Sequence, residues 1–319
     1  MRGIETLIPV KLALVGIGKI ARDQHFPAIS DSPDFTLAAT VSRNAKIDGV
    51  PTFYDLDALL ASDVRFDAVA LCTPPSVRFD MAWRALSAGK YVLLEKPPGA
   101  TLSEVKTLHD FAAQKGLTLY ATWHSRHAAA VEMARDWLAH RRINTLHITW
   151  KEDVRRWHPN QDWIWQAGNL GVFDPGINAL SILTRILPAP VHVSSAELDF
   201  PSDCHTPIAA RLRFHGLNNA TISAEFNWLH TGDQTWDIAV NTDTGTLLLS
   251  EGGSEMAVDG KSVPVAESHE YAAIYQRFSA LIKARQSDVD LAPLRHVADA
   301  FLLGQRHQVA PFYEVQNDL

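Results

Sequence analysis

The sequence predicts an α/β protein of two domains, a doubly wound parallel sheet followed by an α+β domain with a large, mainly antiparallel open sheet. Three observations support this fold class. An apolar strand runs into a glycine-rich turn, apolar runs alternate with helical stretches up to about residue 122, and a two-residue period begins after about residue 143. With 319 residues, 46% hydrophobic and 20% charged, the chain is long enough for two cores.

Five short apolar runs lie in the first part of the chain. Uninterrupted runs of this kind are typical of strands buried on both faces of a parallel sheet. They cover residues 12–15, 37–41, 68–71, 91–94 and 117–121. A capping box, Thr101-Leu102-Ser103-Glu104, begins one of the helices between them, in which Val105, Leu108 and Ala112 have helical spacing. Residues 1–127 are therefore predicted to form a doubly wound α/β domain.

Residues 128–319 are predicted to form a second domain, which binds the substrate. A helix over about 128–139, with Val131, Ala134 and Leu138 on one stripe, leads into it. Two strand faces follow, one with Ile148, Trp150, Glu152 and Val154, the other with Ile222, Ala224, Phe226 and Trp228. Both patterns are typical of antiparallel strands.

Turns and helices complete the second domain. Turn signals at 218–219, 243–245, 252–253 and 259–260 predict a meander, with amphipathic helices near 270–284 and 293–304. An antiparallel sheet needs cover on both faces, so we expect a homodimer that pairs one open face of this sheet with a second subunit.

Charge and composition exclude several classes of partner. The formal net charge of −7 argues against nucleic acid, which requires a basic surface. Cys72 and Cys204 lie far apart without metal-ligand spacing, so neither a disulfide framework nor a metal site is expected. Neither a membrane-spanning run nor a signal peptide is recognisable. We expect a cytoplasmic protein whose partners are small molecules.

The turn Gly16-Ile17-Gly18-Lys19-Ile20-Ala21 directly follows an apolar strand and opens a helix. In this context G-x-G-x-x-A predicts a nicotinamide dinucleotide site, because the glycines let the backbone approach the pyrophosphate and the helix N-terminus attracts negative charge. A tight strand-to-helix turn without a ligand is the alternative interpretation.

The residues after the second strand favour one form of the dinucleotide. NAD enzymes usually place an Asp or Glu there, whereas this chain has Ser42-Arg43. A hydroxyl and a guanidinium suit a 2′-phosphate, so NADP+ is predicted to be preferred, with NAD+ tolerated. The alternative is that Arg43 is an ordinary solvated surface residue.

Two further segments carry residues suited to catalysis. Glu95-Lys96-Pro97 ends a predicted strand at the edge where α/β sheets bind ligands, and the X-Pro bond can adopt the cis form that fixes Lys96. An ordinary surface loop is the alternative. Farther on, Asp174 is predicted as the N-cap and Pro175 as the first residue of an apolar helix. A capped helix explains this pattern, yet Asp174 and Asn178 lie one turn apart and could reach one substrate together.

Aromatic and polar side chains are dense between these two segments: Trp150, Glu152, Arg155, Arg156, Trp157, His158, Trp163 and Trp165. Indole faces beside carboxylates and imidazoles suit a sugar, although some of these tryptophans must belong to the core. Glu152 is predicted to be partly buried and to need a polar partner, for which a substrate hydroxyl would serve. His124 follows the run 117–121 and either borders the same crevice or is a satisfied core histidine.

The order of G-x-G-x-x-A, Glu95-Lys96-Pro97 and Asp174-x-Gly176-x-Asn178 resembles the Gfo/Idh/MocA oxidoreductase family over essentially the whole chain. Residues 19–25, 95–101, 150–159 and 173–178 are similar in detail to its bacterial L-arabinose and D-galactose 1-dehydrogenases. The resemblance implies an N-terminal Rossmann domain and no metal. It implies cofactor contacts from Gly16, Ile17, Gly18, Lys19, Ile20, Ser42, Arg43, Thr73, Pro74, Glu95 and Lys96.

The same resemblance implies oxidation of L-arabinose, D-galactose or D-fucose at C1 to an aldonolactone. Asp174 would accept the proton of the C1 hydroxyl, and Lys96 would orient that hydroxyl and lower its pKa. The implied substrate contacts are His124, Glu152, Trp157, His158, Asn178 and Trp236, with the two tryptophans as walls of the pocket.

Two departures from the family pattern matter. Asn178 stands where most members have a His that is often taken as the base, and Thr73-Pro74-Pro75-Ser76-Val77-Arg78 stands where many read T-P-N-x-x-H. Another sugar or polyol oxidoreductase of inositol or glucose–fructose type is the nearest rival, and the absent His argues against it. A non-catalytic NAD(P)-binding sugar sensor is a second, which the presence of Lys96 and Asp174 disfavours.

Overall fold

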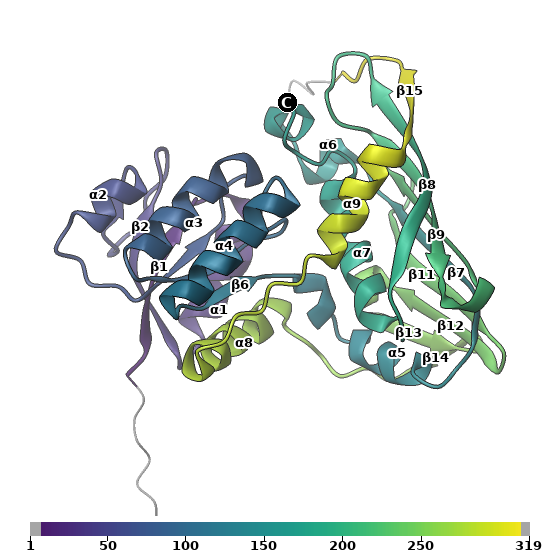
Figure 1. Ribbon diagram of the computed structural model, residues 1–319, viewed down its shortest axis with the longest axis horizontal. Helices are drawn as coiled ribbons and strands as arrows, with labels where there is room; N and C mark the ends of the chain where they lie inside the picture. Colours follow the sequence, from purple (N-terminus) through teal and green to yellow (C-terminus); the bar gives the residue numbers. More distant parts are fainter. Residues whose placement is uncertain (1–7, 314–319) are drawn as a thin grey trace, which may run out of the picture. The chain divides into compact units, whose positions relative to one another are not determined.

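Residues 8–313 of the computed structural model are described, and the chain divides into two compact units (Figure 1). The first comprises the chain up to Thr122 together with Tyr271–Asp290. The second comprises Trp123–Glu270 and the chain from Leu291 onward. This division differs from the expected single boundary between residues 127 and 128, because a segment that is distant in sequence returns to the first unit.

The first unit contains a parallel sheet of six strands in the order β3-β2-β1-β4-β5-β6. The strands are β1 (Val10–Val15), β2 (Phe35–Val41), β3 (Thr52–Phe53), β4 (Ala68–Leu71), β5 (Tyr91–Leu94) and β6 (Leu119–Ala121). The five predicted strands are confirmed. The edge strand β3 was not predicted, because two residues are too few to show a period.

Short and long helices connect these strands: η1 (Ala21–His25), α1 (Phe26–Ser30), α2 (Leu56–Leu60), η2 (Pro75–Val77), α3 (Arg78–Ser87) and α4 (Leu102–Lys115). The predicted capping box begins α4, where Thr101 Oγ1 accepts a hydrogen bond from the Glu104 amide at 3.2 Å. Glu104 Oε2 accepts the amide of Ala100 at 3.0 Å rather than that of Thr101. The first turn of the helix is thereby satisfied as the sequence predicts.

The returning segment is α8 (Glu270–Ala284). Its apolar side chains join the buried cluster that contains Leu12, Leu14 and Phe35 of the parallel sheet. From α8 the members of this cluster are Tyr271, Ile274, Tyr275, Phe278 and Leu281. The stripe at helical spacing was visible in the sequence, but the sheet that it covers is decided by packing alone.

The second unit is built on a sheet of nine strands in the order β14-β13-β12-β11-β7-β10-β9-β8-β15. The strands are β7 (Ile143–Lys151), β8 (Val191–Pro201), β9 (Ala209–Gly216), β10 (Thr221–Asn227), β11 (Thr235–Thr242), β12 (Gly245–Ser250), β13 (Glu255–Val258), β14 (Lys261–Val263) and β15 (Gln305–Val309). The sheet is mainly antiparallel, as predicted. However, β10 pairs with β7 in parallel, and β15 pairs with β8 in parallel.

Helices cover one face of this sheet (Figure 1). The helices of the unit are η3 (His124–His127), α5 (Val131–Leu138), α6 (Val154–Trp157), η4 (Asp162–Trp165), α7 (Phe173–Ile186), η5 (Leu217–Asn219), η6 (Glu251–Gly253) and α9 (Ala292–Leu303). The alternation predicted for 222–228 is confirmed, since Ile222, Ala224, Phe226 and Trp228 are all buried. Among residues 8–313 no helix is both long and apolar enough to cross a membrane.

The structure corrects two local predictions. The strand that contains Ile148 ends at Lys151, because the Asp153 side chain accepts the Arg155 amide and opens α6 at Val154. Glu152 and Val154 are buried all the same.

The second correction concerns the start of α7. The helix begins at Phe173 with Val172 as its N-cap, so Asp174 is not the N-cap and Pro175 is not the first helical residue. The chain already turns earlier, because the Gly171 carbonyl accepts the Asp174 amide at 2.7 Å and Gly171 has a φ of +55°. Asp174 therefore lies inside the first turn, where the helix dipole favours a carboxylate.

Candidate active site

The predicted dinucleotide turn has the geometry that the motif requires. Gly16 has a φ of +96°, and a Cβ there would lie 3.0 Å from the carbonyl carbon of Cys72. A Cβ on Gly18 would meet nothing within 4 Å. No protein atom therefore requires a glycine at position 18. The physical reason for a glycine there is that the protein backbone can approach a bound ligand closely.

The neighbouring residues of the turn lie near its surface. Ile17 and Ile20 are half-buried, whereas Lys19 is exposed and pairs with Asp23. Ala21 is fully buried under the turn, as expected for close packing of the helix on the strand.

Ser42 and Arg43 follow the end of β2. The Ser42 hydroxyl accepts the amides of Ala45 at 3.2 Å and Asn44 at 3.4 Å, which fixes the loop. Arg43 is exposed and makes no hydrogen bond or ion pair with any residue between 8 and 313. Its guanidinium is available to a solute at this edge of the sheet.

Arg78 joins the loops that follow β4 and β5. Its side chain, only 2% exposed, donates to the backbone oxygens of Thr73, Glu95 and Pro97. The departure at Arg78 thus has a structural role that sequence reasoning missed. No local signal pointed to this role, because the backbone oxygens that Arg78 meets lie in other segments. Thr73 and Pro74 stay half-buried beside it.

Lys96 is half-buried, and the peptide bond that joins it to Pro97 is cis. The preceding Glu95 carboxylate is buried, and its Oε2 accepts the Lys96 amide at 2.8 Å. Its Oε1 accepts the Tyr271 hydroxyl at 2.9 Å and lies 3.1 Å from His25 Nε2. His25 and Tyr271 were not predicted, because nothing local in the sequence links three such distant segments.

The second unit gathers several predicted substrate residues into one cluster. His158 Nε2 lies 3.7 Å from Asp174 Oδ2, and the His158 ring lies 5.2 Å from that of Trp228. Asp174 is nearly buried. An imidazole beside a carboxylate at the first turn of α7 can hold or pass a proton.

Glu152 is the centre of the same cluster and is 4% exposed. The indole N–H groups of Trp228 and Trp236 donate to its two oxygens, at 3.0 Å and 2.8 Å. The polar partner expected from a substrate hydroxyl is thus supplied within the protein. A carboxylate oxygen can accept more than one hydrogen bond, so contact with a hydroxyl remains compatible with this arrangement.

Trp157 packs against Trp236, with ring centroids 5.4 Å apart. Asn178 is half-buried, after five buried residues at the start of α7. His124 Nδ1 lies 2.5 Å from Glu270 Oε2.

The buried polar atoms of the second unit that have no hydrogen-bond partner among the described residues include Trp157 Nε1, Asn169 Oδ1 and Gln234 Oε1. These three come from the segments that carry His158, Asp174 and Trp236. Buried polar atoms are normally paired, so these atoms mark places for ligand hydroxyls or water. Asn169 and Gln234 were not predicted as site residues, because the fold buries their side-chain oxygens and no local sequence pattern indicates this burial. Within residues 8–313 no group of His, Cys, Asp or Glu is arranged to hold a metal ion.

The strand order of the first unit, its glycine turn and the open space at Gly18 define an NAD(P)-binding Rossmann domain of an oxidoreductase. The family profile described as "Oxidoreductase family, NAD-binding Rossmann fold" (GFO_IDH_MocA) matches residues 10–122. The chain belongs to the Gfo/Idh/MocA oxidoreductase family.

Known relatives cover both units. The chain is 47% identical over 306 residues to the galactose 1-dehydrogenase of Pseudomonas fluorescens. The aligned region covers 96% of this chain and 99% of that protein. The crystal structure of D-galactose-1-dehydrogenase from Rhizobium etli superposes with a TM-score of 0.93 and 52% identity, over 98% of this chain and 100% of that one. KijD10, a 3-ketoreductase from Actinomadura kijaniata in complex with TDP-benzene and NADP, shares the fold at 19% identity, with a TM-score of 0.80 over 96% of this chain and 100% of that one.

Proposed function

We propose that the protein is an NAD(P)+-dependent aldose 1-dehydrogenase that oxidises D-galactose, D-fucose and L-arabinose at C1 to the aldonolactone. The observation that carries the proposal is the nearly buried Asp174 carboxylate beside His158, in a cluster of indoles and one further carboxylate. Full-length similarity to two galactose 1-dehydrogenases supports the same substrate class.

The oxidised dinucleotide, when bound, supplies the acceptor for the hydride that leaves C1 of the sugar. Residues of the turn from Gly16 to Ile20, together with Ser42, Arg43, Thr73, Pro74, Glu95 and Lys96, would hold it. Asp174 accepts the proton of the C1 hydroxyl, so that the C1–H and O–H bonds are both lost and a C=O bond forms. Lys96 donates a hydrogen bond to the same oxygen and stabilises its developing negative charge. His158 receives or shares the proton held by Asp174.

The sugar is held by the cluster of the second unit. Indole faces of Trp157 and Trp236 suit the C–H face of a pyranose, and polar groups of Glu152, His158, Asn178 and His124 suit its hydroxyls. The unpaired Trp157 Nε1, Asn169 Oδ1 and Gln234 Oε1 add one donor and two acceptors. A polyhydroxylated ring offers both kinds of partner at short spacing.

The exposed Arg43 guanidinium supports a preference for NADP+ over NAD+, with NAD+ still used. The Ser42 hydroxyl can donate to the same 2′-phosphate. Arg43→Ala should lower kcat/KM with NADP+ by at least tenfold and leave the value with NAD+ within twofold. Equal loss with both dinucleotides would contradict the assignment of Arg43.

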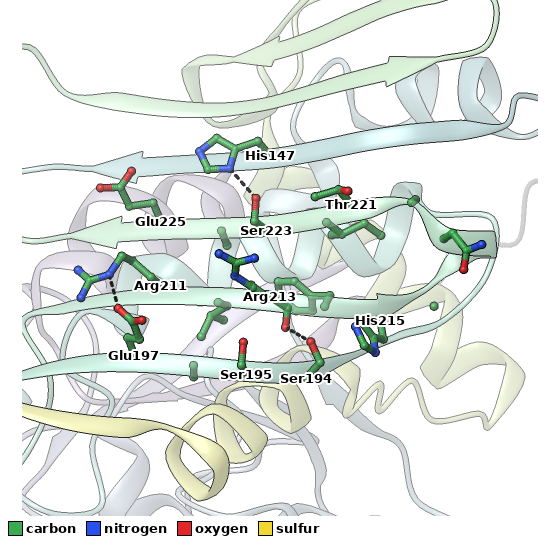
Figure 2. A pocket seen from close by; sticks show the side chains of 18 residues that line it. His147, Ser194, Ser195, Glu197, Arg211, Arg213, His215, Thr221, Ser223 and Glu225 are labelled. Atoms are coloured by element: carbon green, nitrogen blue, oxygen red, sulfur yellow. Dashed lines mark hydrogen bonds and ion pairs between the residues drawn. The ribbon is translucent and has the colours of Figure 1, made fainter.

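We also propose a homodimer through the open face of the nine-stranded sheet. Figure 2 shows His147, Glu197, Arg211, Ser223 and Glu225 on this face. These residues line a hollow with a volume of about 930 Å³. Charges of both signs lie side by side there, with Arg211 Nε 3.0 Å from Glu197 Oε2. A two-fold interface brings a patch against itself, so a patch of mixed sign can pair with its copy.

The dimer is tested by light scattering on the purified protein at several concentrations. Ser223→Arg places a large charged side chain at the centre of the face and should give a monomer. A wild-type protein that is monomeric at micromolar concentration would contradict this part of the proposal.

The function is tested by initial rates of NADP+ and NAD+ reduction with L-arabinose, D-galactose, D-fucose, D-glucose and D-xylose. Asp174→Ala and Lys96→Ala should each lower kcat by at least a hundredfold and retain dinucleotide binding. If both residues serve one chemical step, the double variant should lose much less than the product of the two single losses. An Asp174→Ala variant near the wild-type rate would overturn the base assignment.

The same panel separates the alternatives. Activity with inositol or another polyol and none with aldoses would indicate a different oxidoreductase of the family. Tight dinucleotide binding without reduction by any aldose would favour a non-catalytic NAD(P)-binding sugar sensor.

A further inference from the structure

Four buried polar side chains lie directly behind the Lys96 loop in the first unit: His25, Glu95, Tyr271 and Tyr275. None is more than 5% exposed. His25 Nδ1 lies 2.8 Å from the Tyr275 hydroxyl, and His25 Nε2 lies 3.1 Å from Glu95 Oε1. The Tyr271 hydroxyl donates to the same Glu95 oxygen at 2.9 Å. The four side chains therefore form one continuous hydrogen-bond network.

The network joins three segments that are far apart in the sequence. His25 ends η1, the turn of helix that continues from the glycine-rich turn. Glu95 follows β5 and precedes Lys96, while Tyr271 and Tyr275 lie one turn apart on α8. A rigid connection thus runs from the dinucleotide turn to the Lys96 loop.

The charges within the network balance. A buried carboxylate is costly unless a positive charge and hydrogen bonds compensate it. Burial alone lowers the pKa of His25, but the Cys72 thiol, the Tyr275 hydroxyl and the Glu95 carboxylate around it raise that pKa well above its usual range. Burial raises the pKa of Tyr275 to about 12, so its phenol remains neutral.

The direction of each hydrogen bond follows from these charges. Protonated His25 donates from Nδ1 to the Tyr275 oxygen and from Nε2 to Glu95 Oε1. The second Glu95 oxygen, Oε2, accepts the backbone amide of Lys96 at 2.8 Å. The groups that face His25 are Cys72 at the end of β4, Tyr271 and Tyr275 on α8, and Glu95 after β5.

We propose that His25 and Glu95 are a buried ion pair that positions Lys96, by fixing its backbone amide relative to the helix that carries the dinucleotide turn. Both are positioning residues, because they act through Lys96. The consequence for catalysis rests on the proposed function, whereas the consequence for the Lys96 backbone does not.

Amide hydrogen exchange tests the backbone part without any substrate. Pro97 and Pro98 lack an N–H, so between residues 95 and 98 only Glu95 and Lys96 carry an amide. The Glu95 amide donates to the Leu71 carbonyl at 3.1 Å within the sheet and serves as an internal reference.

His25→Gln keeps a side-chain donor and removes the charge. We expect exchange at the Lys96 amide to accelerate at least tenfold in His25→Gln, while exchange at the Glu95 amide stays within twofold. Unchanged exchange at Lys96, or equal acceleration of both amides, would overturn the proposal. Tyr271→Phe is a second variant, which removes only the hydroxyl that donates to Glu95. It allows the same exchange experiment if His25→Gln does not fold.

Steady-state kinetics with NAD(P)+ and D-galactose test the catalytic part. For His25→Gln and Tyr271→Phe we expect kcat to fall at least tenfold and threefold, with KM for the sugar and Kd for NADPH within threefold of the wild type. Tyr91→Phe is the matched control, because Tyr91 packs against the same cluster away from Glu95 and should keep the wild-type kcat. A kcat that stays at the wild-type value despite faster Lys96 exchange would overturn the link to catalysis.

The two failures are distinguishable. A wild-type protein that oxidises no aldose contradicts the proposed function, and the exchange experiment then still decides whether the ion pair fixes Lys96.

Discussion

Trp228→Phe removes the indole N–H that donates to Glu152 Oε1 at 3.0 Å, in the cluster proposed to bind the sugar. Trp228 is fully buried and Glu152 is 4% exposed, so water cannot replace the lost donor without entering the core. A hydrogen bond to a charged group contributes about 1.5–3 kcal/mol, and the smaller ring adds roughly 1 kcal/mol of lost packing. We expect a total loss of about 2.5–4 kcal/mol of unfolding free energy.

Thermal and urea unfolding measure this loss. A loss of that size lowers Tm by about 2–4 °C for each kcal/mol in a domain of this size, hence roughly 10 °C. Trp83→Phe is the control, since Trp83 stacks on Phe111 with ring centroids 4.0 Å apart and is 37% exposed. Its loss should stay below about 1 kcal/mol.

The origin of the loss is tested by adding Glu152→Gln to Trp228→Phe. Removing the charge of Glu152 lowers the cost of losing the indole donor, so the double variant should be more stable than the sum of the two single losses predicts. A coupling free energy below about 0.5 kcal/mol would refute the reasoning, because the two groups would then act independently.

Three further predictions concern other contacts. Arg78→Gln leaves backbone oxygens of the two loops without a charged donor and should weaken NADPH binding about tenfold (1.4 kcal/mol), measured by fluorescence titration; an unchanged Kd would contradict its role. Lys283→Gln should cost about 0.2–1 kcal/mol at pH 7, because the hydrogen bond from Lys283 lowers the pKa of Asp34. A group with a lowered folded pKa stabilises the protein above its unfolded pKa, so the difference between Lys283→Gln and wild type should vanish as the pH falls below 3.8; a constant difference would disprove it. Gly171→Ala should destabilise by about 2 kcal/mol or more in urea unfolding, since its Cβ would lie 2.4 Å from the Pro207 oxygen, whereas Gly260→Ala, with no atom within 4 Å, should cost about 1 kcal/mol.

The candidate site was predictable where local pattern specifies it. The turn from Gly16, the Lys96 loop, and the pairs of Asp174 with His158 and Glu152 with Trp236 involve residues that the sequence singled out. Partners brought in by the fold were not predictable, and Arg78 and Tyr271 are the clearest cases. A buried guanidinium or phenol is placed by the carbonyl or carboxylate that it meets, and that group lies in another segment.

The sequence by itself determined the five apolar strands, the dinucleotide turn, the capping box at Thr101 and the alternation of 222–228, since each depends on a local period or a local hydrogen bond. Only the tertiary structure decided that α8 packs on the first unit, that β7 and β10 run in parallel, and that Glu152 is held by two indoles. An apolar stripe must pack against another segment, and a buried carboxylate must accept hydrogen bonds from one. The local sequence does not identify that segment. The partner is chosen by packing, which minimises exposed apolar area and unpaired polar atoms over the whole chain at once.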